Sequence, residues 1–248
     1  MLNNTDVSIV IRTLNEDKHL HQLLSSINKQ DTKYNFEIII VDSGSKDDTL
    51  NIAKKFKCNI YHIQKKDFSF GRSLNLGCKN SNGKFIVIVS GHCVPFDNFW
   101  LEKLIKPLNS SKIDYVYGRQ IPGASSFLSE ARIFAKYYPK NSNIPQKVCF
   151  SNNANSAIKK EIWEKYKFDE ELTGLEDIDM ASVSPTEPIL PALGITRLPP
   201  NVVNPPVTTV PARVTFAPLK VAAVVVPDLI IKLPLLLFKD PKVALSSF

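Results

Sequence analysis

Three carboxylates stand close together in the run Leu-Glu-Asp-Ile-Asp at residues 175–179. A carboxylate can take a proton from an attacking hydroxyl group, because that hydroxyl becomes acidic only as the new bond forms. If a helix begins here, Glu176 and Asp177 lie at its amino-terminal end and can face a common site, while Asp179 points elsewhere. The alternative is an acidic first turn that only interacts with the helix dipole.

Polar residues also follow two β-branched runs near the N-terminus. The first run stops at Thr13, Asn15 and Glu16, and the second stops at Asp42. Parallel strands that are buried on both faces read as continuous apolar runs, and open α/β sheets bind ligands at the carboxyl ends of such strands. We therefore expect a ligand site at this edge. For Asp42 the alternative is a turn carboxylate, because Ser-Gly-Ser follows it.

The elements that position these residues are read from the spacing of apolar side chains. Leu20, Leu23, Leu24 and Ile27 recur at helical spacing, and similar patterns predict further helices and strands. Four parallel strands with helical crossovers are expected. The other predicted helices begin near 47–49 and cover 72–79 and 98–108, the other strands cover 58–63, 84–89 and 114–118, and 119–144 is expected to form a packing helix and a loop.

Composition excludes some classes of protein. The formal charge of +7 suits an anionic partner, but lysine is spread along the chain, so we expect a solvated basic surface and no nucleic-acid partner. The four cysteines show no C-x-x-C spacing, which argues against a zinc site and for free thiols in a reducing compartment. An apolar strand follows Asp6 directly, so we expect no signal peptide and a cytoplasmic protein.

Five segments occur in a recognisable order: 7–15, 41–49, 70–77, 83–88 and 175–179. Together they resemble a family 2 glycosyltransferase of the GT-A fold. The resemblance implies a nucleotide-sugar-binding α/β fold whose mostly parallel central sheet is flanked by helices. It also implies inverting transfer of a sugar from a UDP- or dTDP-linked donor to an acceptor hydroxyl. Bacterial enzymes of capsule or O-antigen synthesis are the nearest type, with a lipid-linked or oligosaccharide acceptor and peripheral contact with the inner face of the plasma membrane.

The resemblance assigns a role to individual residues. Asp177, with Glu176 beside it, matches the catalytic base, and Asp42 matches the residue that recognises the pyrimidine. Arg72 would face the diphosphate, because its planar guanidinium suits phosphate oxygens. The other implied donor contacts are Thr13, Asn15, Glu16, Ser43, Asn75, Ser90 and Gly91, and the implied contacts with the transferred sugar or acceptor are Asn152 and Asn153.

The metal motif departs from the family pattern. Most relatives carry Asp-x-Asp at the end of this strand, whereas here the residues are Ser90, Gly91 and His92. A divalent cation, manganese or magnesium, could still bind through His92, although imidazole prefers manganese, zinc or cobalt to magnesium. The alternative is catalysis without metal, with His92 and Arg72 supplying positive charge.

The C-terminal part has a different composition. Residues 181–248 hold 12 of the 17 prolines, which excludes long helices and central strands. Residues 219–238 are apolar but interrupted by Asp228, Lys232 and two prolines, so an interfacial or buried segment is favoured over a membrane span. We expect a glycosyltransferase domain at 1–180 and a proline-rich extension at 181–248 that contacts acceptor, membrane or another subunit. The alternative function is a catalytically inactive nucleotide-sugar-binding or scaffold subunit of a polysaccharide synthase.

Overall fold

The computed structural model describes residues 5–123, 128–138, 140–142, 146, 150–182, 221–223 and 229–231. The strands are β1 Val7–Thr13, β2 Phe36–Asp42, β3 Asn59–His62, β4 Phe85–Ser90, β5 Cys93–Pro95, β6 Tyr115–Tyr117, β7 Gln120–Pro122, β8 Asn155–Lys159, β9 Val221–Ala223 and β10 Leu229–Ile231. The helices are α1 Asp17–Asn28, α2 Thr49–Lys55, α3 Phe70–Lys79, α4 Trp100–Ile105, α5 Leu128–Tyr137, α6 Lys160–Lys165 and α7 Glu176–Ser182, with 3-10 turns η1 Lys65–Asp67 and η2 Lys106–Asn109.

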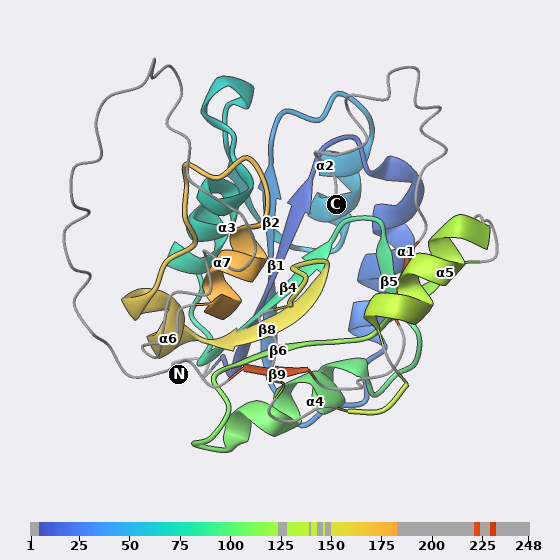
Figure 1. Cartoon of the computed structure of the whole chain (residues 1–248). Coiled ribbons are helices and arrows are strands. Elements are labelled where there is room, and N and C mark those ends of the chain that lie inside the picture. Colours follow the sequence, from blue (N-terminus) through green and yellow to red (C-terminus); the bar gives the residue numbers. More distant parts are fainter. Residues whose placement is uncertain are drawn as a thin grey trace, which may run out of the picture.

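The central sheet has the order β3-β2-β1-β4-β8-β6-β9, and its first four strands run parallel as the sequence predicts (Figure 1). β1 lies between β2 and β4, and the register pairs Thr13 with Asp42 and Arg12 with Ser90. The carboxyl ends of these three strands therefore lie level at one edge of the sheet. This is the edge at which the polar residues of the sequence were expected to gather.

The sheet also contains a strand that the sequence analysis did not predict. β8 pairs antiparallel with β4 on one side and with β6 on the other, so it carries the sheet beyond its parallel part. Its sequence Asn-Ser-Ala-Ile-Lys has no continuous apolar run, which hides it from a reading based on hydropathy. A second, three-stranded sheet joins β5, β10 and β7.

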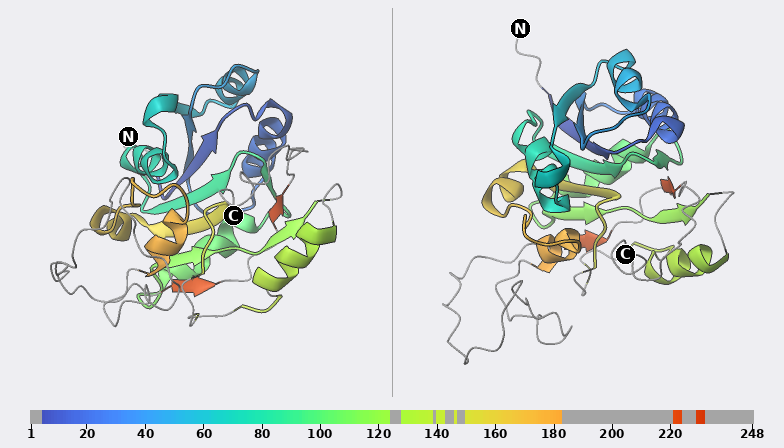
Figure 2. Two further views of the ribbon diagram at one scale, coloured as in Figure 1. Left: turned by 45° about the horizontal axis from the view of Figure 1, so that its top comes forward. Right: turned by 90° about the horizontal axis from the view of Figure 1, so that it is seen from above.

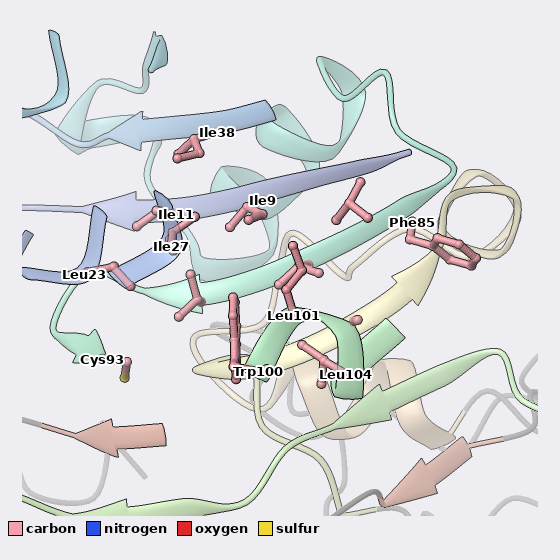
Figure 3. Close-up of a cluster of buried hydrophobic side chains, with 14 of the residues drawn as sticks. Ile9, Ile11, Leu23, Ile27, Ile38, Phe85, Cys93, Trp100, Leu101 and Leu104 are labelled. Carbon is pink, nitrogen blue, oxygen red and sulfur yellow. The ribbon is translucent and has the colours of Figure 1, made fainter. Parts of the chain in front are cut away.

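Helices cover both faces of the parallel strands, as the two rotated views show (Figure 2). On one face, side chains of α1, α2 and α4 pack against alternate residues of β1, β2 and β4, such as Ile9, Ile11 and Val87 (Figure 3). On the other face, side chains of α3, α6 and α7 pack against the residues between them, such as Val10 and Ile88. Because successive side chains of a strand point to opposite faces, each apolar run supplies both cores.

The same alternation decides to which face of the sheet each polar side chain at the strand ends points. Arg12 shares a face with Val10 and therefore points toward α3 and α7, whereas Thr13 and Asp42 share the face of Ile11 and Ile40. The ligand edge thus has two sides. One side is formed with the first turn of α7, and the other with the loops that lead into α1 and α2.

The predicted helices and strands of the first 118 residues are present, with boundaries shifted by a few residues. The start of α2 is held by Asp47, whose carboxylate accepts from the backbone N–H of Thr49, the first residue of the helix, at 3.0 Å. Asp48 occupies the N-cap position of α2, but its carboxylate accepts from the side chain of Asn51 instead.

Two expectations fall partly on residues outside those described. In the segment 119–144, the described residues form β7 and α5. Of the extension at 181–248, the described residues are 181–182 at the end of α7 and the two short strands β9 and β10. None of the helices in the described part of the chain has the length and hydropathy that a membrane crossing requires.

Candidate active site

The carboxylate of Asp42 is buried at the end of β2, with 1% of the residue exposed. One oxygen accepts from the backbone N–H groups of Gly44 and Ser45, each at 2.9 Å. The other accepts from the hydroxyl of Thr13 at 3.1 Å and from that of Ser45. These four donors match the accepting capacity of a carboxylate, so the turn role weighed from the sequence is present. A pyrimidine imide would have to replace one of the four.

The loops after β1 and β2 are joined by a set of hydrogen bonds. Asn15 has a φ of 57°, a conformation that asparagine tolerates better than most residues, and its amide oxygen accepts from Lys46 N at 2.8 Å. Its N–H donates to the Ser45 hydroxyl at 2.9 Å. The Ser43 hydroxyl donates to the carbonyl of Thr13 at 3.2 Å. Thr13, Asn15, Ser43 and Asp42 therefore belong to one rigid corner.

The replacement for the Asp-x-Asp motif lies beside this corner. His92 Nδ1 is 3.1 Å from Glu16 Oε1. The Glu16 side chain also lies close to Gly91, because a Cβ atom added to Gly91 would be 2.9 Å from the Cγ of Glu16. Ser90, at the end of β4, donates its N–H to the carbonyl of Ala154 at 3.3 Å. An imidazole nitrogen and a carboxylate oxygen thus adjoin the strand end at which the resemblance implies a cation, and these ligand types suit manganese.

Those two residues do not form a complete metal centre. Within the described ranges, no three side chains of histidine, cysteine, aspartate or glutamate converge as ligands of one ion. The remaining ligands of a cation held by His92 and Glu16 would have to come from substrate oxygens and water, which is a common arrangement for cations that bridge phosphates.

The acidic run begins α7, as the first expectation required. Glu176 is buried, with 5% exposed, and its carboxylate accepts from the Asn153 amide at 3.4 Å. Asp177 Oδ2 accepts from the backbone N–H of Asn153 at 3.3 Å, and its Oδ1 from that of Ile178 at 2.8 Å. The loop before β8 therefore holds both acids.

The protonation of Asp177 is shifted by its surroundings. Burial, reinforced by the charge of Glu176, raises the pKa of Asp177 to about 6, although hydrogen bonds from two backbone N–H groups oppose the shift. A carboxylate with this pKa is still ionised at neutral pH, and it is a stronger base than an ordinary aspartate. Perturbed pKa values of this kind cluster at functional sites.

Asn152 and Asn153 are engaged within the protein. The Asn152 amide oxygen accepts from Gln120 Nε2 and from Ala154 N, both at 2.8 Å. The Asn153 amide oxygen accepts from the Tyr115 hydroxyl at 2.9 Å and from the Ser156 hydroxyl at 3.0 Å. In this arrangement Asn153 supports the acidic turn, and direct contact of either residue with a sugar stays a prediction.

Arg72 and Asn75 lie on α3 and contact the loop that precedes α7. The Arg72 guanidinium is 3.3 Å from a carboxylate oxygen of Glu170 and donates to the carbonyl of Asp67 at 2.8 Å. Asn75 donates to the Phe168 carbonyl at 2.9 Å and accepts from Trp163 Nε1 at 3.0 Å. Asn75 therefore braces α3 against the loop that precedes α7, and its contact with the donor stays a prediction. Glu170 competes with any phosphate for Arg72, whose role at the diphosphate stays a prediction.

Arg12 is the residue that sequence reasoning missed. Its Nη1 is 3.6 Å from Glu176 Oε1, and its guanidinium carbon lies 4.7 Å from the centre of the Phe70 ring. The signal was present, because an arginine interrupts the apolar run of β1 just before the strand end. Hydropathy alone does not distinguish such an interruption from an ordinary strand end.

The structure brings most of the predicted residues to a single edge of the sheet. Asp42 and Asp177 lie on opposite sides of β1, connected through Thr13, which contacts Asp42, and Arg12, which contacts Glu176. Ser90 pairs with Arg12 across the same edge. Arg72 and Asn75 lie farther along, facing the 168–170 loop.

Comparison with known proteins matches this arrangement. The sequence profile of glycosyl transferase family 2 matches residues 8–167, which is more than half of the chain. The chain belongs to glycosyl transferase family 2. The matched range includes the ends of β1, β2 and β4 and the Asn152-Asn153 loop, and α7 follows it.

A curated relative gives a second comparison. The O-antigen chain rhamnosyltransferase RfbN of Salmonella typhimurium is 27% identical over 188 residues, which make up 71% of this chain and 60% of that protein. The chain thus matches less than two thirds of the length of this relative.

Solved structures establish the fold of this family member as GT-A. The Staphylococcus aureus TarS fragment 1–349 in complex with UDP aligns with a TM-score of 0.59 at 19% identity, over 71% of this chain and 54% of that chain. The mannosyltransferase PcManGT from Pyrobaculum calidifontis in complex with GDP-Man and Mn2+ aligns with a TM-score of 0.55 at 17% identity, over 72% and 51% of the two chains.

Proposed function

We propose that this chain carries out inverting transfer of a sugar from a nucleotide-diphosphate donor to an acceptor hydroxyl in the synthesis of a bacterial surface polysaccharide, such as capsule or O-antigen. The observation that carries the proposal is the acidic turn at the ligand edge of the sheet, where Asp177 has a raised pKa beside the buried Glu176. Family membership and the likeness to an O-antigen rhamnosyltransferase support it.

In the proposed reaction Asp177 is the general base. The acceptor oxygen attacks the anomeric carbon from the face opposite the diphosphate, the bond from that carbon to the diphosphate oxygen breaks, and Asp177 takes the hydroxyl proton. Attack from the opposite face inverts the configuration. With a pKa of about 6 the carboxylate is ionised at neutral pH and ready to accept that proton.

The donor is proposed to lie over the carboxyl ends of β1, β2 and β4. Asp42, Thr13, Ser43 and Asn15 would form the corner that receives the nucleoside, and UDP or dTDP is the proposed carrier. The complex of TarS with UDP supports a uridine nucleotide. Ser90 and Gly91 would approach the diphosphate, because they end the strand beside this corner.

A divalent cation would bind through His92 and Glu16, whose facing atoms lie 3.1 Å apart. The Mn2+ in the mannosyltransferase complex supports this proposal. When bound, the cation would neutralise the negative charge that develops on the leaving diphosphate. Because His92 and Glu16 already face one another, each would supply one ligand atom to the cation.

The acceptor and the cellular site are proposed from the chemistry of the family. A lipid-linked or oligosaccharide acceptor would approach from the side of Asn152 and α7. Synthesis on a lipid carrier would require the enzyme to work at the inner face of the plasma membrane as a peripheral protein. The described residues that would meet such an acceptor first include Leu175, which is 39% exposed.

The test is turnover by Asp177→Asn, with Asp179→Asn as the matched control. Both variants remove one charge from the same turn, but Asp179 lies outside the proposed catalytic pair. Release of UDP or dTDP from a panel of UDP- and dTDP-linked sugars is measured with a bacterial lipid extract as the source of acceptors. We expect loss of about 10²- to 10⁴-fold for Asp177→Asn and a change of a few-fold at most for Asp179→Asn.

Two outcomes would overturn this proposal. Full turnover by Asp177→Asn would remove the base from the mechanism. Tight binding of a nucleotide sugar by the wild type without any turnover would favour the inactive binding or scaffold subunit instead.

A further inference from the structure

Arg12 occupies an unusual place for a charged side chain. It lies in β1, a central strand of the sheet, and its side chain points to the face that α3 and α7 cover. Only 18% of that side chain is exposed. Within the described part of the chain, its buried Nη1 makes no hydrogen bond, and its nearest carboxylate is that of Glu176 at 3.6 Å. Such burial is costly unless the charge is paired.

The partners of Arg12 come from two helices. The ring of Phe70, the first residue of α3, packs 4.7 Å from the guanidinium carbon. Glu176, the first residue of α7, is itself buried and needs a counter-charge. Burial lowers the pKa of Arg12, while the charges of Glu176 and Asp177 oppose that shift. One arginine therefore joins the end of β1 to the starts of α3 and α7.

The start of α7 is also a strained piece of backbone. Leu175, directly before Glu176, has a φ of 66°, which is rare for a branched apolar residue. Strained residues persist where the surrounding structure over-determines them, and they concentrate at functional sites. The contacts that hold the turn against this strain come from Asn153 on one side and from Arg12 on the other.

We propose that Arg12 is a positioning residue for the catalytic acids: its guanidinium holds Glu176 against the end of β1 and so fixes the turn in which Asp177 faces the donor. The inference rests on the proposed function, in which Asp177 is the base. Arg12 itself is not assigned contact with the substrate.

The groups that face Asp177 determine how the proposal can be measured. Glu176 is its neighbour on α7, Arg12 approaches from β1, and the hydroxyls of Tyr115 on β6 and of Tyr138 after α5 lie near enough for Asp177 to raise their pKa values. Both tyrosines stay neutral at the pH values of interest, because burial is the main cause that raises their pKa values. Glu176 is thus the charge that raises the pKa of Asp177, and the negative charge of Asp177 in turn opposes the lowering of the Arg12 pKa.

The experiment is a charge cycle read by NMR on the full chain without ligand. The ¹³C-carboxylate titration of Asp177 is recorded in the wild type, Glu176→Gln, Arg12→Met and Arg12→Met/Glu176→Gln. We expect Glu176→Gln to lower the pKa of Asp177 by about one unit, since it removes a like charge. The double variant should raise that pKa again by about one unit relative to Glu176→Gln, since it also removes the cation.

A control variant separates local from general effects. Lys33→Met removes a positive charge from the exposed pair with Glu102 and should leave the Asp177 titration unchanged. Arg12→Met alone should make the Asp177–Glu176 pair take up its first proton at a higher pH. If that single variant does not fold, the comparison of Glu176→Gln with the double variant still decides, because neither contains an unpaired buried Glu176.

Equal Asp177 titrations in Glu176→Gln and in the double variant would overturn the inference, since Arg12 would then not act on the base. The titration of Asp177 is recorded without any turnover. The inference about Arg12 can therefore be wrong while the proposed function is right, and the reverse. If the titrations behave as expected but Asp177→Asn remains fully active, the interaction of Arg12 with Glu176 and Asp177 is confirmed, and the assignment of Asp177 as the base is wrong.

Discussion

At the scale of single residues, the proposed role of Asp177 as the base comes with a cost in stability. Its pKa of about 6 in the folded protein lies above the ordinary aspartate value of 3.8. The folded state therefore binds a proton more tightly than the unfolded state. As the pH rises from the lower of these two pKa values to the higher, the free energy of unfolding decreases. At pH 7 the full cost applies, and it is about 3 kcal/mol by linkage.

Asp177→Asn should therefore stabilise the protein at neutral pH while it abolishes turnover. We expect a gain of up to about 3 kcal/mol at pH 7, reduced by any hydrogen bond that the amide makes less well than the carboxylate. The gain should disappear below about pH 4, where Asp177 is protonated in both states. Urea unfolding at pH 4, 5, 6 and 7 measures it, and a gain that does not depend on pH would contradict the linkage argument.

Asp42 shows the limit of assigning a residue from its position alone. The sequence placed it correctly at a strand end, and both its interpretations were stated. The structure adds that its carboxylate already accepts four hydrogen bonds from its own loop and from Thr13. No hydropathy pattern contains that information, because the four donors depend on the path of the loop.

At the scale of secondary-structure elements, the packing of α3 against the 168–170 loop supports the acidic turn. Gly71 approaches the loop so closely that a Cβ at this position would lie 2.0 Å from the backbone oxygen of Asp169. One turn later, the amide oxygen of Asn75 accepts from the backbone N–H of Phe168 at 3.1 Å, and its amide nitrogen donates to the Phe168 carbonyl. Glycine is required at 71 because two backbones meet there.

Gly71→Ala should destabilise the protein through this contact. The methyl group meets backbone atoms, which cannot rotate away, so the loop or α3 must shift. We expect a loss of about 1–3 kcal/mol, as for other overpacked positions, and a lower melting temperature. Lys79→Ala, an exposed position of the same helix, is the control and should change stability by less than about 0.5 kcal/mol. An unchanged melting temperature for Gly71→Ala would mean that the helix and loop are not in close contact.

Of the elements that the sequence analysis did not predict, β8 has the most contacts with the candidate site. It is short, half polar and antiparallel, so neither a continuous apolar run nor a strict alternation marks it. It is nonetheless central to the site, because the Asn152-Asn153 loop enters it and carries the hydrogen bonds to the acidic turn. Its pairing with β4 is a long-range interaction that local pattern does not contain.

At the scale of the whole molecule, ligand binding can be measured as an increase in the stability of the folded protein. A nucleotide and a cation that bind the folded state and not the unfolded chain raise the melting temperature, by the equivalent of about 2.7 kcal/mol at a hundredfold excess over Kd. The proposed cation site joins the ends of β1 and β4, since Glu16 follows one strand and His92 the other. Binding there would tie the sheet edge together.

We expect UDP to raise the melting temperature and manganese to add a further increment in the presence of UDP. His92→Ala should remove the manganese increment while it leaves the UDP increment in place. His21→Ala, on the exposed side of α1, is the matched control and should keep both increments. A manganese increment that survives in His92→Ala would exclude this histidine as a ligand.

The sequence by itself determined the parallel part of the sheet, its helical crossovers and the edge at which the polar candidate residues gather. It could do so because buried parallel strands leave continuous apolar runs, and because their polar ends follow at once in the chain. Those are local signals. They also sufficed to name Asp177, Glu176 and Asp42 as candidates, whereas His92 became a candidate through the resemblance to family 2 glycosyltransferases.

Only the tertiary structure decided which of these residues act on one another. Arg12 meets Glu176, Asn153 supports Asp177, and Glu170 engages Arg72, and every one of these pairs is distant in the chain. The physical reason is that electrostatic and hydrogen-bond partners are selected by distance in space. Spacing along the sequence constrains such distances within one helix or strand, but not between elements that the fold brings together.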